Sequence, residues 1–120
     1  MPVRRAEEGL AAIDEALSEA LAHSERWWDA ELHRLRGKFL LIHGADTYDI
    51  EAAFLRAISI AQSQQARSLE LRATMSLARL WIAQHRTDDA KRLLKDVYDW
   101  FTEGFETPDL QAARLLLAQL

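Results

Sequence analysis

The residues of this chain that could support metal or acid–base chemistry are its histidines, but they are dispersed along the sequence. A zinc site on one helix needs two histidines four residues apart, and other zinc sites need clusters of cysteine and histidine. No two histidines have that spacing, and the chain has no cysteine. His85 and Asp89 are four residues apart, but a predicted helix break separates them, so we interpret His85 as a solvated or capping residue. We therefore expect no metal site, and the four histidines are His23, His33, His43 and His85.

The small residues likewise carry no catalytic or phosphate-binding motif. The four glycines form neither the GxGxxG fingerprint nor the GxxxxGK[ST] loop that cradles phosphates on helix N-termini. No serine lies in a GxSxG nucleophile motif. We therefore expect the chain not to be an enzyme and to need no cofactor.

Composition favours a single helical, water-soluble domain of 120 residues, of which 49% are hydrophobic and 28% charged. The net charge of −4 argues against nucleic acid or an anionic membrane surface as a partner. No apolar run approaches the roughly 20 residues of a membrane span. The absence of cysteine suits a reducing compartment, so we expect a cytoplasmic location.

Breakers and capping residues divide the chain into six predicted helices. Gly44 is expected to end one helix in the left-handed conformation. Thr87 is predicted to cap the N-terminus of another helix, as is Thr107, which precedes Pro108 at the first helical position. The predicted helices span about residues 5–22, 25–43, 48–64, 68–85, 87–102 and 108–120.

The helices also repeat. A shift of 41 residues aligns Gly37 with Ala78 and Gly44 with His85. One residue inserted in the first turn extends the match, so that Phe54 aligns with Leu94. A partial upstream copy places Gly9, Ile13 and Ala16 opposite Ile50, Phe54 and Ala57. Small residues alternating with large apolar ones are what closely crossing helices require.

The content of this repeat, "LRGKFLLIHG" followed by "AAFLRAISIA", resembles the tetratricopeptide repeat, although its period exceeds the usual 34 or so residues and Arg36 replaces an expected leucine. The resemblance implies an all-α, right-handed solenoid of about six antiparallel helices with a C-terminal capping helix. The expected single domain, 1–120, comprises a partial repeat 5–22, repeats 25–64 and 67–102, and a capping helix 108–120.

A longer resemblance covers most of the chain. "GLAAIDEAL", "ERWWDAELHRLRG", "ARSLELRATMSLARLW" and "VYDWFTEGFETPDLQAARLLL" look like the tetratricopeptide-like C-terminal tail of bacterial AAA/STAND signalling ATPases, which are often fused to adenylate/guanylate cyclase domains. The resemblance implies a protein–protein interaction scaffold, the regulatory array of a larger signalling protein. Its partners would be a protein, a peptide or other domains of the parent chain. It implies no ATPase or cyclase activity here.

Two adjacent tryptophans occupy different lines of the predicted second helix. Trp28 begins the apolar stripe that continues through Leu32, Leu35 and Phe39, so it is predicted to be a core residue. Trp27 falls on another line, and we expect it to face a groove or cover the first helix.

Mapped through the repeat resemblance, the line of Trp27 belongs to the concave face that binds peptides in such arrays. Its cations predict a preference for acidic or carboxylate-terminated peptides. Glu31 is expected to pair with Arg34 too weakly to hold Arg34 out of the groove. The predicted groove residues are Trp27, Glu31, Arg34, Lys38, Arg72, Met75 and Arg79.

Three alternatives remain open from the sequence. The array could instead be a sensor that binds a small effector in its concave groove. The aromatic cluster of Tyr98, Trp100, Phe101 and Phe105 is predicted to pack the last helix, with a ligand-stacking surface as the other interpretation. The run from Leu115 to Leu117 makes the last helix apolar over a broad arc, which leaves room for a homo-oligomer.

Overall fold

Five consecutive helices span residues 29–118 in the computed structural model, which describes residues 8–16 and 28–120. Residues 8–16 are also helical, so each of the six predicted stretches contains a helix, and the described residues include no strand. The all-α class is therefore confirmed. The bounds are α2 (Asp29–His43), α3 (Thr47–Ser63), α4 (Arg67–Ala83), α5 (Thr87–Tyr98) and α6 (Pro108–Ala118).

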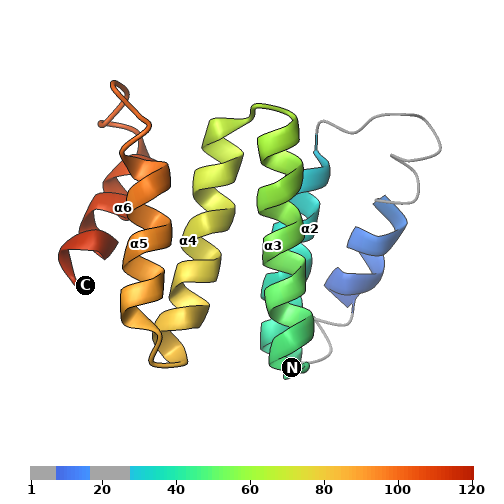
Figure 1. Cartoon of the computed structure of the whole chain (residues 1–120). Coiled ribbons are helices and arrows are strands. Elements are labelled where there is room, and N and C mark those ends of the chain that lie inside the picture. Colours follow the sequence, from blue (N-terminus) through green and yellow to red (C-terminus); the bar gives the residue numbers. More distant parts are fainter. Residues whose placement is uncertain (1–7, 17–27) are drawn as a thin grey trace.

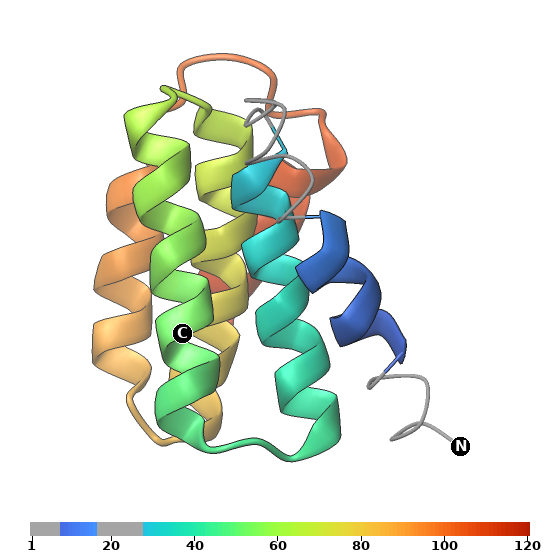
Figure 2. The same cartoon turned by 90° about the vertical axis from the view of Figure 1, so that its right-hand side faces the viewer.

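The helices pack in chain order, each against the next (Figure 1). In addition, α4 contacts both α2 and α6, whereas α3 and α5 do not meet. The side view shows the result: α3 and α5 lie along one face, and α2, α4 and α6 lie toward the other (Figure 2). The central helix is α4, which is buried on two sides.

Two buried clusters form the core. The first joins α3 to α4 and contains Ile50, Phe54, Ala57, Ile58, Ala73, Leu77 and Leu80. The second joins α4 to α5 and α6 and contains Leu71, Met75, Ala78, Ala90, Leu94, Leu110 and Ala113. Because α4 contributes to both clusters, it couples the two helix pairs through one continuous core.

Residues that the 41-residue shift aligns have equivalent places in the two helix pairs. A Cβ atom on Gly37 would lie 2.6 Å from the Phe54 ring, so α2 and α3 cross here at a distance only glycine allows. Their aligned counterparts, Ala78 and Leu94, are both fully buried in the second cluster. In the second pair the first helix thus has alanine in place of glycine, and the second helix has leucine in place of the larger phenylalanine.

Helix ends repeat as well. Gly44 ends α2 with φ 80°, as predicted, and its aligned residue His85 ends α4 with φ 64°. In each turn the next amide bonds to a carbonyl five residues back: Ala45 to Leu40 at 3.0 Å and Arg86 to Trp81 at 2.8 Å. This pattern is the Schellman motif, which satisfies carbonyls that the helix end leaves unpaired.

The other predicted boundaries are partly right. Thr107 occupies the cap position of α6 and Pro108 begins the helix as predicted, but the Thr107 hydroxyl donates to the Gly104 carbonyl at 2.8 Å instead of capping a helix amide. Thr87 is the first helical residue of α5 rather than its cap, because Arg86, which closes the preceding turn, occupies the capping position. The fifth helix also ends at Tyr98 instead of residue 102, since the chain tightens there into turns such as the 3.1 Å bond from Phe101 to Tyr98.

The prediction that Trp28 is a core residue is wrong, since 47% of its side chain is exposed. Its backbone keeps the helical conformation, and its carbonyl accepts the Leu32 amide at 3.0 Å. Trp28 nevertheless stands at the cap, before the first helical residue, Asp29, where its side chain remains largely exposed. The most buried line of α2 instead runs through Ala30 and Gly37. Leu32, Leu35 and Phe39 are half-buried.

Segment 8–16 lies beside α2 (Figures 1 and 2). Gly9 abuts the Phe39 ring, where an added Cβ atom would come within 2.7 Å. Arg36 donates to Asp14 at 3.0 Å. The rest of the predicted partial repeat 5–22, and Trp27, lie outside the described residues. No described helix combines the length and apolar character needed to cross a membrane.

Candidate peptide-binding groove

A ladder of alternating charges joins the three helices α2, α4 and α6. The Arg72 guanidinium lies 3.3 Å from a Glu31 carboxylate oxygen and 3.0 Å from an Asp109 oxygen. Glu31 and Arg72 are 41 residues apart, so they hold the same position in successive repeats. The ladder therefore pairs negative, positive and negative side chains across neighbouring helices.

Arg34 is also bound into this ladder, because its Nε donates to Glu31 at 3.0 Å. Burial alone would raise the pKa of Glu31, but the hydrogen bond from Arg34 and the charges of Arg34 and Arg72 outweigh it and lower that pKa. The hydrogen bond to Asp109 and the nearby carboxylates raise the pKa of Arg72. Both shifts favour the charged forms of Glu31 and Arg72.

Two predicted groove cations are consequently committed to internal partners. The Arg34 side chain is only 12% exposed and Glu31 only 11%, so their pair is not the weak, exposed pair that the sequence suggested. Arg72 remains partly exposed but contacts two carboxylates. A peptide meeting this end of the face finds a largely neutralised surface.

Further along the same face, α2 and α4 enclose a hollow of about 200 Å³. Its apolar wall includes Leu41 and Leu80, and buried Phe54 closes its floor. Lys38 and Arg79 stand on opposite sides, one on each helix. We call this feature the α2–α4 groove; its lining residues are Lys38, Leu41, Phe54, Ser76, Arg79, Leu80 and Ala83.

The two charged residues of the groove have the same sign, whereas those of the ladder have opposite signs. Lys38 and Arg79 are again separated by one 41-residue repeat, and both are exposed. Neither forms an ion pair within the described part of the chain. Two like charges at neighbouring positions repel each other, and an anion between them would relieve that repulsion. The geometry therefore suits a carboxylate beside an apolar side chain.

The remaining predicted groove residues fall elsewhere. Met75 is wrong as a groove residue: it is 4% exposed and belongs to the second buried cluster, because α6 packs over this part of α4. Trp27 lies outside the described residues. Of the seven predicted residues, Lys38 and Arg79 alone line the α2–α4 groove.

Several residues of this face were not predicted. One is Asp109, which completes the ladder through its ion pair with Arg72. Another is Leu80, which is buried in the first cluster and also lines the groove. The helical line through Arg79 excludes Leu80, so only the spacing between α2 and α4 could identify it.

The other sequence candidates are only partly used in packing, since Trp100, Phe105 and Leu115 remain exposed. Tyr98 and Phe101 pack against the second cluster, and the Tyr98 and Phe105 rings lie 5.8 Å apart. Trp100 is covered on one face by the Arg67 guanidinium, 4.4 Å from its ring centre. In α6, Leu116 and Leu117 pack against the same cluster, and Leu115 is the exposed member of the leucine run.

Among the described residues, no three histidine or acidic side chains gather in a way that could hold a metal ion. Searches of protein-family models, curated proteins and solved structures found no match for this chain.

Proposed function

We propose that this chain is a tetratricopeptide-like interaction module that binds an acidic, preferably carboxylate-terminated, peptide in the α2–α4 groove. The parent protein would be a cytoplasmic signalling ATPase or cyclase, with this array as its regulatory tail. The partner would be another protein or a segment of the parent chain. The observation that carries the proposal is the pair Lys38 and Arg79, like charges flanking one apolar hollow.

The charge ladder supports the choice of site. At the first of two aligned positions, Glu31 and Arg72 carry opposite charges and form an ion pair between α2 and α4. Seven residues later along each helix, the same geometry holds two cations and no acid. Glu31 and Asp109 are already paired with Arg72. A carboxylate from a bound peptide would therefore be the counter-ion of Lys38 and Arg79.

The size of the groove also favours a peptide over a small effector. Small-molecule sites typically enclose about 300–1,000 Å³, whereas this hollow measures about 200 Å³. One aliphatic side chain fits such a space, and the rest of the peptide would run along the helices. Burial of that side chain would contribute on the order of 1.5–3 kcal/mol before the costs of association.

The test titrates short peptides ending in Leu-Asp with a free carboxylate, and the same peptides ending in Leu-Asn amide. We expect the acidic peptide to bind more tightly, and its advantage to shrink as salt rises. Lys38→Glu and Arg79→Glu should each weaken binding by about fivefold or more.

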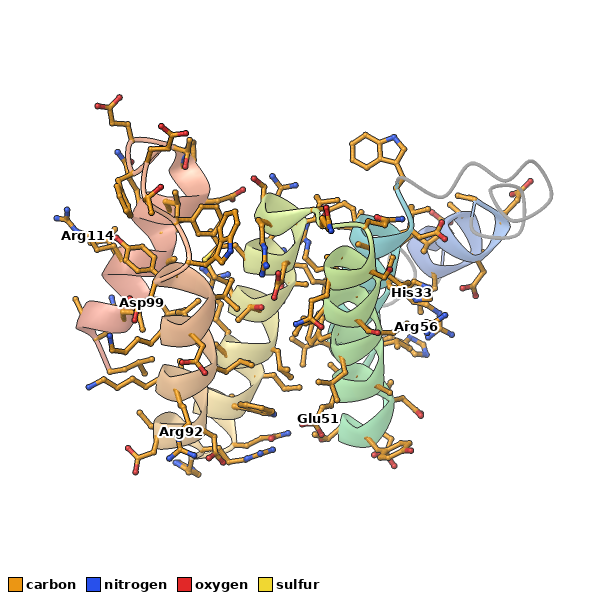
Figure 3. The ribbon with its side chains drawn as sticks, turned by 45° about the horizontal axis from the view of Figure 1, so that its top comes forward. His33, Glu51, Arg56, Arg92, Asp99 and Arg114 are labelled. Carbon is orange, nitrogen blue, oxygen red and sulfur yellow. The ribbon has the colours of Figure 1, made fainter. Side chains whose placement is uncertain are left out.

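Matched controls lie on α5. Lys91 and Arg92 are exposed and form no ion pair among the described residues, so Lys91→Glu and Arg92→Glu change the net charge equally (Figure 3). Both controls should bind the acidic peptide within about twofold of the parent chain. Equal weakening by the control variants would contradict the proposal, since it would reduce the effect to overall charge.

A further inference from the structure

A second hollow lies on the edge of the α2–α3 pair, away from the α2–α4 groove, and it measures about 400 Å³. Figure 3 shows His33 of α2 and Arg56 of α3 close together on this edge, near segment 8–16. We call it the His33 hollow. Its lining residues are His33, Arg36, Leu40, Asp49, Ala52, Ala53 and Arg56.

The charges of the hollow are unevenly distributed. Arg36 donates to Asp14 at 3.0 Å, whereas Arg56 is exposed and forms no ion pair with any described residue. Asp49 lies seven residues before Arg56, about 10 Å along α3. Asp29 and Asp14 also act on His33, but Asp14 is paired with Arg36, and Arg56 is the cation of this lining without a carboxylate partner among the described residues. We call the end that contains His33 and Arg56 the basic end.

The surroundings of His33 shift the pKa of its imidazole. Burial lowers the pKa of His33, and the charges of Arg56 and Arg36 lower it further, against the opposing effect of Asp29 and Asp14. Near neutral pH the ring is therefore mostly uncharged, and an anion beside it would reverse the balance.

The second helix pair shows that this polarity is not required by the fold. The residues aligned with His33 and Arg36 are Thr74 and Leu77, both fully buried. In that pair, Trp81 and Leu93 also pack against the first cluster. The first pair thus carries a histidine and an arginine where its counterpart packs against a neighbouring helix.

We propose that the basic end of the His33 hollow binds a tetrahedral oxyanion of the phosphate class, either free phosphate or the monoester of a small molecule. Arg56 supplies an unpaired guanidinium, which can donate two parallel hydrogen bonds to such an oxyanion. His33 supplies a third donor from the facing helix, whereas Arg36 lines the hollow with its charge paired to Asp14. The site differs from the α2–α4 groove in its helices, its residues and its ligand.

Protonation should accompany binding. A dianion favours the charged imidazole, so it raises the pKa of His33 and binds more tightly when the ring is protonated. The groups that face the ring are Arg36 and Asp29 on α2, Arg56 and Asp49 on α3, and Asp14 on segment 8–16. Histidine is the residue type that changes charge near neutral pH, so we assign the pH dependence of binding to His33.

The first experiment follows the His33 ring signal by NMR while inorganic phosphate or glycerol 2-phosphate is added at constant ionic strength. We expect saturable shifts with millimolar dissociation constants. Arg56→Gln should weaken binding by about fivefold or more, and the matched control Arg92→Gln by less than about twofold. If glycerol 2-phosphate binds but phosphate does not, the site selects a monoester; if neither gives saturable shifts, the proposal is wrong.

The second experiment uses sulfate, because it stays a dianion from pH 8 to pH 6 and so reports only on the protein. Affinity should rise at least threefold or so on acidification, and saturating sulfate should raise the pKa of His33 by about half a unit or more. In His33→Gln the affinity at pH 8 should be retained and the pH dependence lost. A sulfate affinity that does not change with pH in the parent chain would overturn the role of His33.

Discussion

At the residue scale, the clearest signature of the repeat is the left-handed residue that ends α2 and α4. Gly44 adopts this conformation without strain, but His85 has a Cβ atom and a positive φ of 64°. A non-glycine residue in the left-handed region costs roughly 1–2 kcal/mol, so the second turn keeps its Schellman geometry at a cost. Gln65 ends α3 with the same left-handed conformation, φ 55°, and the Ala66 amide bonds to the Ala61 carbonyl at 2.9 Å, so this turn forms at three helix ends with three different residues.

Substitutions at these two positions should have opposite effects. We expect His85→Gly to raise the free energy of unfolding by about 0.5–1 kcal/mol, because it removes the backbone strain. Gly44→Ala should lower it by about 1 kcal/mol; its added Cβ would meet no atom within 4 Å, so strain is the whole effect. Urea denaturation measures both, and a loss of stability in His85→Gly would show that its side chain contributes more than the strain costs.

At the scale of elements, the crossing of α2 and α3 depends on the pair Gly37 and Phe54. The ring of Phe54 occupies the space that any Cβ atom at position 37 would need, at 2.6 Å. The crossing of α4 and α5 pairs Ala78 with Leu94. Compared with the first crossing, alanine is larger than glycine and leucine is smaller than phenylalanine. The two pairs solve the same packing problem with different divisions of volume.

This exchange of volume predicts a compensating pair of substitutions. Gly37→Ala should destabilise the chain by about 1–3 kcal/mol, because the methyl group overlaps the Phe54 ring. Gly37→Ala with Phe54→Leu reproduces the combination found in the second pair and should recover at least half of that loss. A double-mutant cycle measures the coupling, and simple additivity of the two losses would contradict the account of the crossing.

At the scale of the whole molecule, the helices could be predicted because they depend on local residue types and spacing. Gly44, Thr107 and Pro108 mark helix ends through conformations that those residues adopt on their own. The position of Met75 could not be predicted, because the packing of α6 over α4 decides it. Likewise the ladder that occupies Arg72 requires Asp109, 37 residues away in the sequence.

The pH dependence of stability is a second property of the whole molecule. The pKa of Glu31 is lowered from 4.5, so its stabilising effect is complete above that pH and is lost as pH falls through the folded-state pKa. The pKa of His33 is lowered from 6.5, so the unfolded chain binds a proton first and stability falls as pH drops below that value. Both groups therefore make the fold sensitive to acid.

Denaturant unfolding between pH 7 and pH 3 tests this assignment in two windows. Between pH 7 and 5, the loss of stability should be smaller in His33→Gln than in the parent chain. Below about pH 4.5, Glu31→Gln should flatten the remaining loss, although it lowers stability at neutral pH because Arg34 and Arg72 lose their partner. If the free energy of unfolding changes with pH in the same way in all three chains, groups other than His33 and Glu31 cause the sensitivity to acid.

The central claim, that Lys38 and Arg79 flank an anion-selective peptide groove, is tested most directly by exchanging charge on both sides. The chain with Lys38→Glu and Arg79→Glu would be titrated with a peptide ending in Leu-Asp and with one ending in Leu-Lys amide. We expect the double variant to lose the acidic peptide and to bind the basic one, so that the preference reverses by about tenfold or more. An unchanged preference for the acidic peptide would contradict the account.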